Sequence, residues 1–110
     1  MKVLIVEDEA LIAIDLATQI EDLGEEVVGP ASNLEAGLDL AGKGPLDFAL
    51  LDVNLRGKQS APIARLLSSR GVPFVFLTGY DSPRLDEEFP DIDILSKPLS
   101  AQDLKRILSI

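Results

Sequence analysis

The chain has 110 residues, with 19 acidic and 10 basic side chains and a formal net charge of −9. Such a negative surface disfavours nucleic-acid backbones and anionic membranes as direct ligands. The sequence contains neither cysteine nor histidine, which excludes disulfides, thiolate metal sites and the commonest general base. Length and a 46% hydrophobic content predict one soluble domain over residues 1–110. Without a signal peptide or a membrane-length apolar run, we expect a cytoplasmic protein.

Apolar strand patterns alternate with amphipathic helix patterns along the whole chain. In chain order they are a strand at 2–6, a helix at 9–23, a strand at 25–29, a helix from 32 ended by the glycines at 42 and 44, a strand at 46–51, a helix from 60 closed by the glycine at 71, a strand at 72–77, a short helix from 82 ended by the proline at 90, a strand at 92–95 and a helix from 100. Ser32 with Glu35, and Ser100 with Asp103, match the capping pattern of helix starts.

This alternation predicts an α/β fold with a parallel sheet covered by helices on both faces, because parallel strands need a crossover between them. The strands are almost continuously apolar, as expected for strands buried on both sides. Five such units favour the doubly wound, flavodoxin-like (βα)5 sheet with strand order 2-1-3-4-5. Ligands of open parallel sheets bind beyond the carboxyl ends of the strands.

Reactive side chains follow four of the five predicted strands. Glu7 and Asp8 follow the first strand, Asp52 the third, Thr78 the fourth and Lys97 the fifth. Each has an ordinary explanation when taken alone, as a helix-capping acid, a turn residue or a solvated lysine. Chance is a much weaker explanation for all of them at one rim of the sheet. We therefore interpret them as one site.

The composition of this site predicts a divalent cation and phosphoryl chemistry. Two carboxylates ~4–5 Å apart repel by roughly 3–4 kcal/mol at an effective dielectric near 20. Mg²⁺ relieves such repulsion and prefers carboxylate, carbonyl and water oxygens. Lys97 adds a fixed positive charge, and Thr78 adds a hydroxyl donor. An exposed carboxylate nucleophile, Asp52, beside these groups is suited to accept a phosphoryl group.

These residues resemble the receiver domain of two-component response regulators, over all 110 residues. The resemblance rests on the pair Glu7-Asp8, on Asp52 in LLDVNL, on Thr78 in FLTGY and on Lys97 in LSKP. It implies that Asp52 takes a phosphoryl group from a histidine kinase or a histidine phosphotransfer protein. Phosphorylation would then switch binding to a downstream protein, and the domain would catalyse only its own phosphorylation and dephosphorylation.

The same resemblance implies a ligand set for Mg²⁺. Asp8, Asp52 and the backbone carbonyl of Asn54 would bind the ion directly, while Glu7 would act through water. On this view the side chain of Asn54 matters little for the metal. The resemblance also implies a cis peptide bond between Lys97 and its following proline, where cis bonds are commonest.

The segment GVPFVFLTGYD together with DVNLRG resembles the single-domain "FAT GUY" receivers, although Leu77 replaces the alanine of that name. This implies a bacterial protein that works with HWE-type histidine kinases. Ile94 stands where receivers usually carry an aromatic switch residue, three positions before the lysine. Tyr80 is the only tyrosine and becomes the candidate switch residue. We expect the segment from Tyr80 to Pro90 to change on activation.

Alternative functions remain open at this point. A haloacid-dehalogenase-type phosphatase needs a second acid two residues after its nucleophile, where this chain has Asn54. A flavodoxin-like FMN binder needs a hydroxyl-rich phosphate loop after the first strand, where Glu7 and Asp8 would repel phosphate. The stronger alternatives are a pseudo-receiver that binds a partner without phosphorylation, and a receiver that acts as a phosphate sink.

Overall fold

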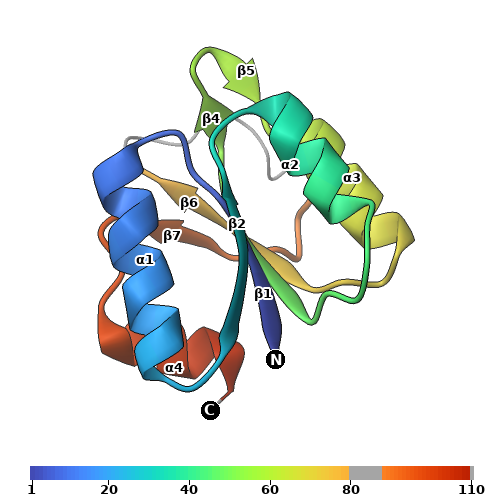
Figure 1. The fold of residues 1–110 in the computed structure, drawn as a ribbon. Coiled ribbons are helices and arrows are strands. Elements are labelled where there is room, and N and C mark those ends of the chain that lie inside the picture. Colours follow the sequence, from blue (N-terminus) through green and yellow to red (C-terminus); the bar gives the residue numbers. More distant parts are fainter. Residues whose placement is uncertain (80–87, 110) are drawn as a thin grey trace.

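The computed structural model describes residues 1–79 and 88–109. Within them, five parallel strands form the central sheet, in the order β2-β1-β3-β6-β7. Their bounds are Lys2–Val6 for β1, Glu26–Ala31 for β2, Phe48–Asp52 for β3, Phe74–Thr78 for β6 and Ile94–Ser96 for β7. Counted over this sheet alone, the order is 2-1-3-4-5. The predicted flavodoxin-like α/β fold is confirmed (Figure 1).

Helices cover both faces of the sheet. The described residues contain four: α1 at Ala10–Asp22, α2 at Leu34–Ala41, α3 at Ala61–Ser69 and α4 at Ala101–Leu108. Helices α1 and α4 lie on one face, and α2 and α3 on the other (Figure 1). The helix predicted from Ser82 falls mostly outside the described residues. Of the helices in the described part of the chain, none is long and apolar enough to cross a membrane.

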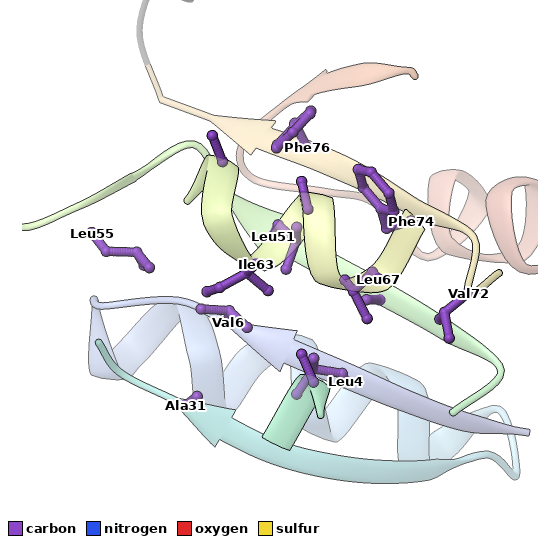
Figure 2. Packing of buried hydrophobic residues seen from close by; sticks show 14 of the residues in the cluster. Leu4, Val6, Ala31, Leu51, Leu55, Ile63, Leu67, Val72, Phe74 and Phe76 are labelled. Carbon is purple, nitrogen blue, oxygen red and sulfur yellow. The ribbon is translucent and has the colours of Figure 1, made fainter. Parts of the chain in front are cut away.

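The core explains why β1 is apolar from Val3 to Val6. In β1, Leu4 and Val6 belong to the cluster beneath α2 and α3, where Figure 2 shows Val6 beside Ile63. Val3 and Ile5 point the other way, into the cluster beneath α1 and α4. Because successive strand residues face opposite sides and both sides are covered, no position of the strand is left for a polar residue. The first polar residues therefore come at the strand ends.

Three strands are displaced from their predicted positions in the same way. β3, β6 and β7 each begin two residues later and end one residue later than the apolar pattern indicates. The residues just before them still pack on the core, as Leu46 and Val72 do. At the other end, Asp52 and Thr78 remain paired with the neighbouring strand despite their polar side chains. Two residues of the predicted site are thus the last residues of strands.

Helix capping confirms one prediction and corrects another. Ser100 and Asp103 form the reciprocal capping box at the start of α4. The predicted cap of α2 is wrong by one residue, because the side chain of Asn33, not that of Ser32, accepts the N–H of Ala36 at 2.8 Å. An asparagine and a serine are almost equally good caps, so sequence alone does not choose between neighbours.

A small hairpin after β3 was not predicted. Asn54–Leu55 forms β4 and Lys58–Gln59 forms β5, paired antiparallel across a two-residue turn. Both turn residues have positive φ, +53° at Arg56 and +87° at Gly57. Figure 1 shows the hairpin at the end of the sheet where α1 begins. It lies beside the rim at which the predicted site residues gather.

The corrected cap of α2 can be tested by mutation. Asn33→Ala should lower the free energy of unfolding by about 1 kcal/mol, because the N–H of Ala36 loses its acceptor. Ser32→Ala should leave stability nearly unchanged. Urea unfolding followed by circular dichroism measures both. A larger loss for Ser32→Ala than for Asn33→Ala would restore the original assignment.

Candidate functional site

The sheet brings the predicted residues together at its carboxyl edge. Glu7 directly follows β1, and its N–H donates to the carbonyl of Ala31 at 2.9 Å. Asp52 ends β3 and lies opposite Leu77 of β6 in the strand pairing. Lys97 directly follows β7, and its N–H donates to the carbonyl of Thr78 at 2.9 Å. The backbone pairing of the sheet therefore fixes the positions of the Cα atoms that carry these side chains.

Lys97 links two buried acids. Its Nζ lies 2.9 Å from Oε1 of Glu7 and 3.2 Å from Oδ2 of Asp52. The side chains are only 11%, 0% and 7% exposed, respectively for Lys97, Glu7 and Asp52. Buried ion pairs are strongly coupled, because removing one partner leaves the other charge unpaired and poorly solvated. The peptide bond between Lys97 and Pro98 is cis, as the sequence resemblance implies.

Asp8 completes a cluster of three carboxyl groups. One carboxylate oxygen from each of Glu7, Asp8 and Asp52 lies within 4.8 Å of the others. Asp8 is the more exposed member, and its Oδ2 accepts the backbone N–H of Arg56 at 3.1 Å. Backbone N–H groups also reach the other two acids, from Glu9 to Glu7 at 3.0 Å and from Asn54 to Asp52 at 3.4 Å.

The electrostatics of the cluster are unbalanced. Burial raises the pKa of Asp52, and the carboxyl groups of Glu7 and Asp8 raise it further, to about 7, against the opposing charge of Lys97. Burial also disfavours charged Lys97, but its bonds to Glu7 and Asp52 outweigh this effect and raise its pKa. Lys97 therefore stays an ammonium, while Asp52 keeps a proton more readily than an ordinary aspartate.

The donor set fits a hard divalent cation. All three side chains offer oxygen, which Mg²⁺ prefers, and their oxygens are close enough together to share one ion. The cluster holds three acids, while Lys97 is the only cation that the described contacts place against Glu7 and Asp52. A divalent cation would remove the repulsion that raises the pKa of Asp52. Neutral or anionic groups would not.

Of the remaining predicted residues, the structure describes Thr78 and Ile94 but not Tyr80. Thr78 is half-buried at the end of β6, and a Cβ added at the next residue, Gly79, would lie 3.7 Å from Cε of Lys97. The chain after Thr78 thus passes directly beside the lysine. Ile94 lies opposite Phe76 in the pairing of β7 with β6, and packs on the core. Tyr80 lies outside the described residues.

A groove beside the cluster was not foreseen from the sequence. Its volume is about 390 Å³, and it is lined by Glu7, Asp8, Ala10, Ala13, Ile14, Pro30, Ser32 and Arg56. One wall is apolar and belongs largely to the start of α1. Two large apolar side chains of that helix are exposed, Leu11 by 82% and Ile14 by 60%. The sequence does contain a signal for them, because Leu11 and Ile14 lie off the apolar stripe of Ile12, Leu16 and Ile20.

Comparison with known proteins agrees with this geometry. A family model described as the response regulator receiver domain matches residues 3–109. The transcriptional regulatory protein PdtaR of Mycobacterium tuberculosis is 34% identical over 107 residues, which cover 94% of this chain and 52% of PdtaR. The chain spans about half the length of the curated relatives it matches.

Solved structures show the same relationship. SdrG from Sphingomonas melonis Fr1 superposes with a TM-score of 0.87 at 39% identity, covering 99% of this chain and 93% of that chain. A BeF3-activated conformation of SdrG gives a TM-score of 0.81 at 38% identity, covering 98% and 92%. A response regulator from Burkholderia pseudomallei, solved with a phosphorylated aspartic acid, calcium ion and citrate, gives 0.80 at 26% identity, covering 94% and 63%. The chain belongs to the family of response regulator receiver domains.

Proposed function

We propose that this domain is a phosphoacceptor, in which Asp52 receives a phosphoryl group from a histidine of another protein. The observation that carries the proposal is the position of Asp52, at the end of β3, 3.2 Å from the Lys97 ammonium and within 4.8 Å of two further acids. Related proteins support it, since SdrG has a BeF3-activated conformation and the Burkholderia regulator carries a phosphorylated aspartic acid.

The transfer step can be written from the groups at the site. One carboxylate oxygen of Asp52 attacks phosphorus and forms an acyl phosphate, while the N–P bond of the donor phosphohistidine breaks. The electron pair of that bond returns to the histidine nitrogen. Lys97 then pairs with a phosphoryl oxygen, and the Thr78 hydroxyl donates to another. The donor lies outside these 110 residues, which contain no histidine.

The cation belongs to the same proposal. Asp8, Asp52 and the backbone carbonyl of Asn54 would hold Mg²⁺ directly, with Glu7 acting through water. When bound, Mg²⁺ offsets negative charge on the phosphoryl oxygens. Glu7 also keeps the Lys97 ammonium beside Asp52, through the 2.9 Å contact between them. The acids therefore serve both the cation and the orientation of the lysine.

A donor protein would approach over the groove beside Asp8. The apolar wall formed by Ala13, Ile14 and Pro30 gives such a partner a surface to bury next to the acids. Exposed Leu11 and Ile14 extend that surface along α1. We therefore propose that a histidine kinase or histidine phosphotransfer protein docks here, with HWE-type kinases as the class that the FAT GUY resemblance favours.

The signal leaves the site through residues that the phosphoryl group engages. Thr78 and Lys97 lie on adjacent strand ends that are joined by a backbone hydrogen bond of 2.9 Å. A phosphoryl group that binds both side chains would shift the conformational equilibrium of the segment that follows Thr78. Ile94 offers no aromatic ring for this coupling, so Tyr80 stays the proposed switch residue. A downstream protein would read the change.

Phosphotransfer identifies the acceptor directly. Incubation with a phosphorylated histidine kinase and Mg²⁺ should label the wild-type domain and leave Asp52→Asn unlabelled, because the amide cannot form an acyl phosphate. Asp22→Asn, an exposed acid at the end of α1, is the matched control and should be labelled like wild type. Hydroxylamine-sensitive label on Asp52→Asn would move the acceptor to another residue.

A charge in the groove wall should block the donor without harming the chemistry. Ile14→Asp should slow transfer from the kinase at least about fivefold, the factor that corresponds to roughly 1 kcal/mol at an interface position. Labelling by a small phosphodonor such as acetyl phosphate should not change. Ser68→Asp adds the same charge at an exposed position of α3, on the opposite face of the sheet, and serves as the control. Equal transfer to both variants would place the docking surface elsewhere.

The raised pKa of Asp52 predicts how stability depends on pH in the absence of metal. A carboxyl group whose pKa rises from 3.8 to about 7 on folding stabilises the fold at low pH and loses that contribution as pH rises towards neutrality. Asp52→Asn should not lose stability in this way, because an amide does not ionise. Its stability relative to wild type, measured by urea unfolding in EDTA, should therefore increase between about pH 4 and about pH 7. A constant difference would show that folding does not raise the pKa of Asp52.

A further inference from the structure

We propose that the β4–β5 hairpin is a positioning element of the cation site. The backbone N–H of Arg56 fixes the carboxylate of Asp8, and the turn formed by Arg56 and Gly57 holds that N–H in place. This inference rests on the proposed Mg²⁺ site and assigns to it residues whose side chains bind neither the ion nor the phosphoryl group.

Asp8 is held differently from the other two acids. Glu7 and Asp52 are buried and share the Lys97 ammonium. Asp8 is half-exposed, and its Oδ2 accepts the N–H of Arg56 at 3.1 Å, across 48 residues of sequence. A ligand carboxylate needs such a partner to keep one orientation, and a hydrogen bond from a group that does not itself bind the metal commonly provides it. For Asp8 that partner is the tip of the hairpin.

The backbone of the turn is unusual in a way that requires support. Arg56 has a φ of +53°, a left-handed conformation that is unfavourable for a residue with a Cβ. In the described part of the chain, Ser109 is the only other non-glycine residue with positive φ, and it caps α4. Strained backbone of this kind persists where the surroundings determine it, and it concentrates at functional sites.

Three contacts hold the turn in place. The Asn54 side chain accepts the N–H of Gly57 at 2.7 Å, so it closes the turn from inside. Leu55, 2% exposed, anchors one strand in the core. Lys58 on the other strand pairs with Glu35 of α2 at 3.1 Å. The tip is thus connected to both the core and a neighbouring helix.

On this proposal Asn54 has two roles, in contrast to the sequence-based expectation that its side chain matters little for the metal. Its backbone carbonyl is an expected ligand of the cation, while its side chain shapes the turn that orients Asp8. Two of the expected oxygen ligands, from Asp8 and Asn54, consequently depend on the same short hairpin. Distortion of the turn should weaken cation binding even though no ligand atom is removed.

A matched pair of glycine variants tests this directly. Gly57→Val places a β-branched residue at φ +87°, and Gly24→Val does the same at φ +85° in the turn after α1. Among the described residues, an added Cβ meets no heavy atom within 4 Å at either position, so both changes act through backbone strain. Gly57→Val should raise the Mg²⁺ dissociation constant about tenfold or more, the usual effect of disturbing a ligand's hydrogen-bond partner. Gly24→Val should leave it unchanged.

A third variant separates the backbone of Arg56 from its side chain. Arg56→Asn keeps the N–H, removes the guanidinium and creates the Asn-Gly pair that two-residue hairpin turns prefer. It should bind Mg²⁺ at least as tightly as wild type. Weaker binding would assign the effect to the guanidinium and overturn the inference, as would equal dissociation constants for Gly57→Val and wild type.

Amide hydrogen exchange of Arg56, measured by NMR without metal, distinguishes this inference from the proposed function. Exchange at Arg56 should be slow in wild type and faster in both Asp8→Ala and Gly57→Val. Equal exchange rates in wild type and Asp8→Ala would overturn the inference whatever the metal does. A wild-type protein that shows slow Arg56 exchange but ignores Mg²⁺ would contradict the proposed cation site and support the contact between Arg56 and Asp8.

Discussion

The ion pairs of Lys97 with Glu7 and Asp52 are the interaction on which the site depends. They place one ammonium between two buried carboxyl groups, with a third acid, Asp8, close by. Without Lys97 the fold would bury uncompensated negative charge, which is very costly. With it, the cluster remains short of positive charge, and the pKa of Asp52 rises to about 7. The proposed binding of a cation and then of a phosphoryl group would draw on this residual imbalance.

The fold imposes this imbalance and also tolerates it. Both faces of the sheet are buried, so β1 and β3 are apolar up to their carboxyl ends. Their acids therefore lie at the same edge of the sheet. The backbone pairing of Asp52 with Leu77 prevents the acid from moving out into water. The two hydrophobic clusters supply the stability that offsets the repulsion. Functional sites commonly break local rules in this manner, and the rest of the fold compensates.

The sequence predicts the architecture and the gathering of the acids with Lys97, because both follow from strand periodicity and from the topology of parallel sheets. It misplaces strand ends, because Val72 packs on the core without strand pairing and Asp52 is paired without being apolar. The hairpin escapes prediction for a related reason. Arg-Gly is a weak turn signal compared with Asn-Gly, and the turn depends on Asn54 and the core as well as on Gly57.

The most direct test of this account is the free energy of unfolding as a function of Mg²⁺ concentration at neutral pH. If the excess negative charge of Glu7, Asp8 and Asp52 is a cation site, Mg²⁺ at ten times its dissociation constant should stabilise the wild-type domain by about 1.4 kcal/mol. The domain with Asp8→Asn and Asp52→Asn together should gain much less. Equal unfolding free energies for wild type in Mg²⁺ and in EDTA would contradict the account, because the acids would then be balanced without a cation.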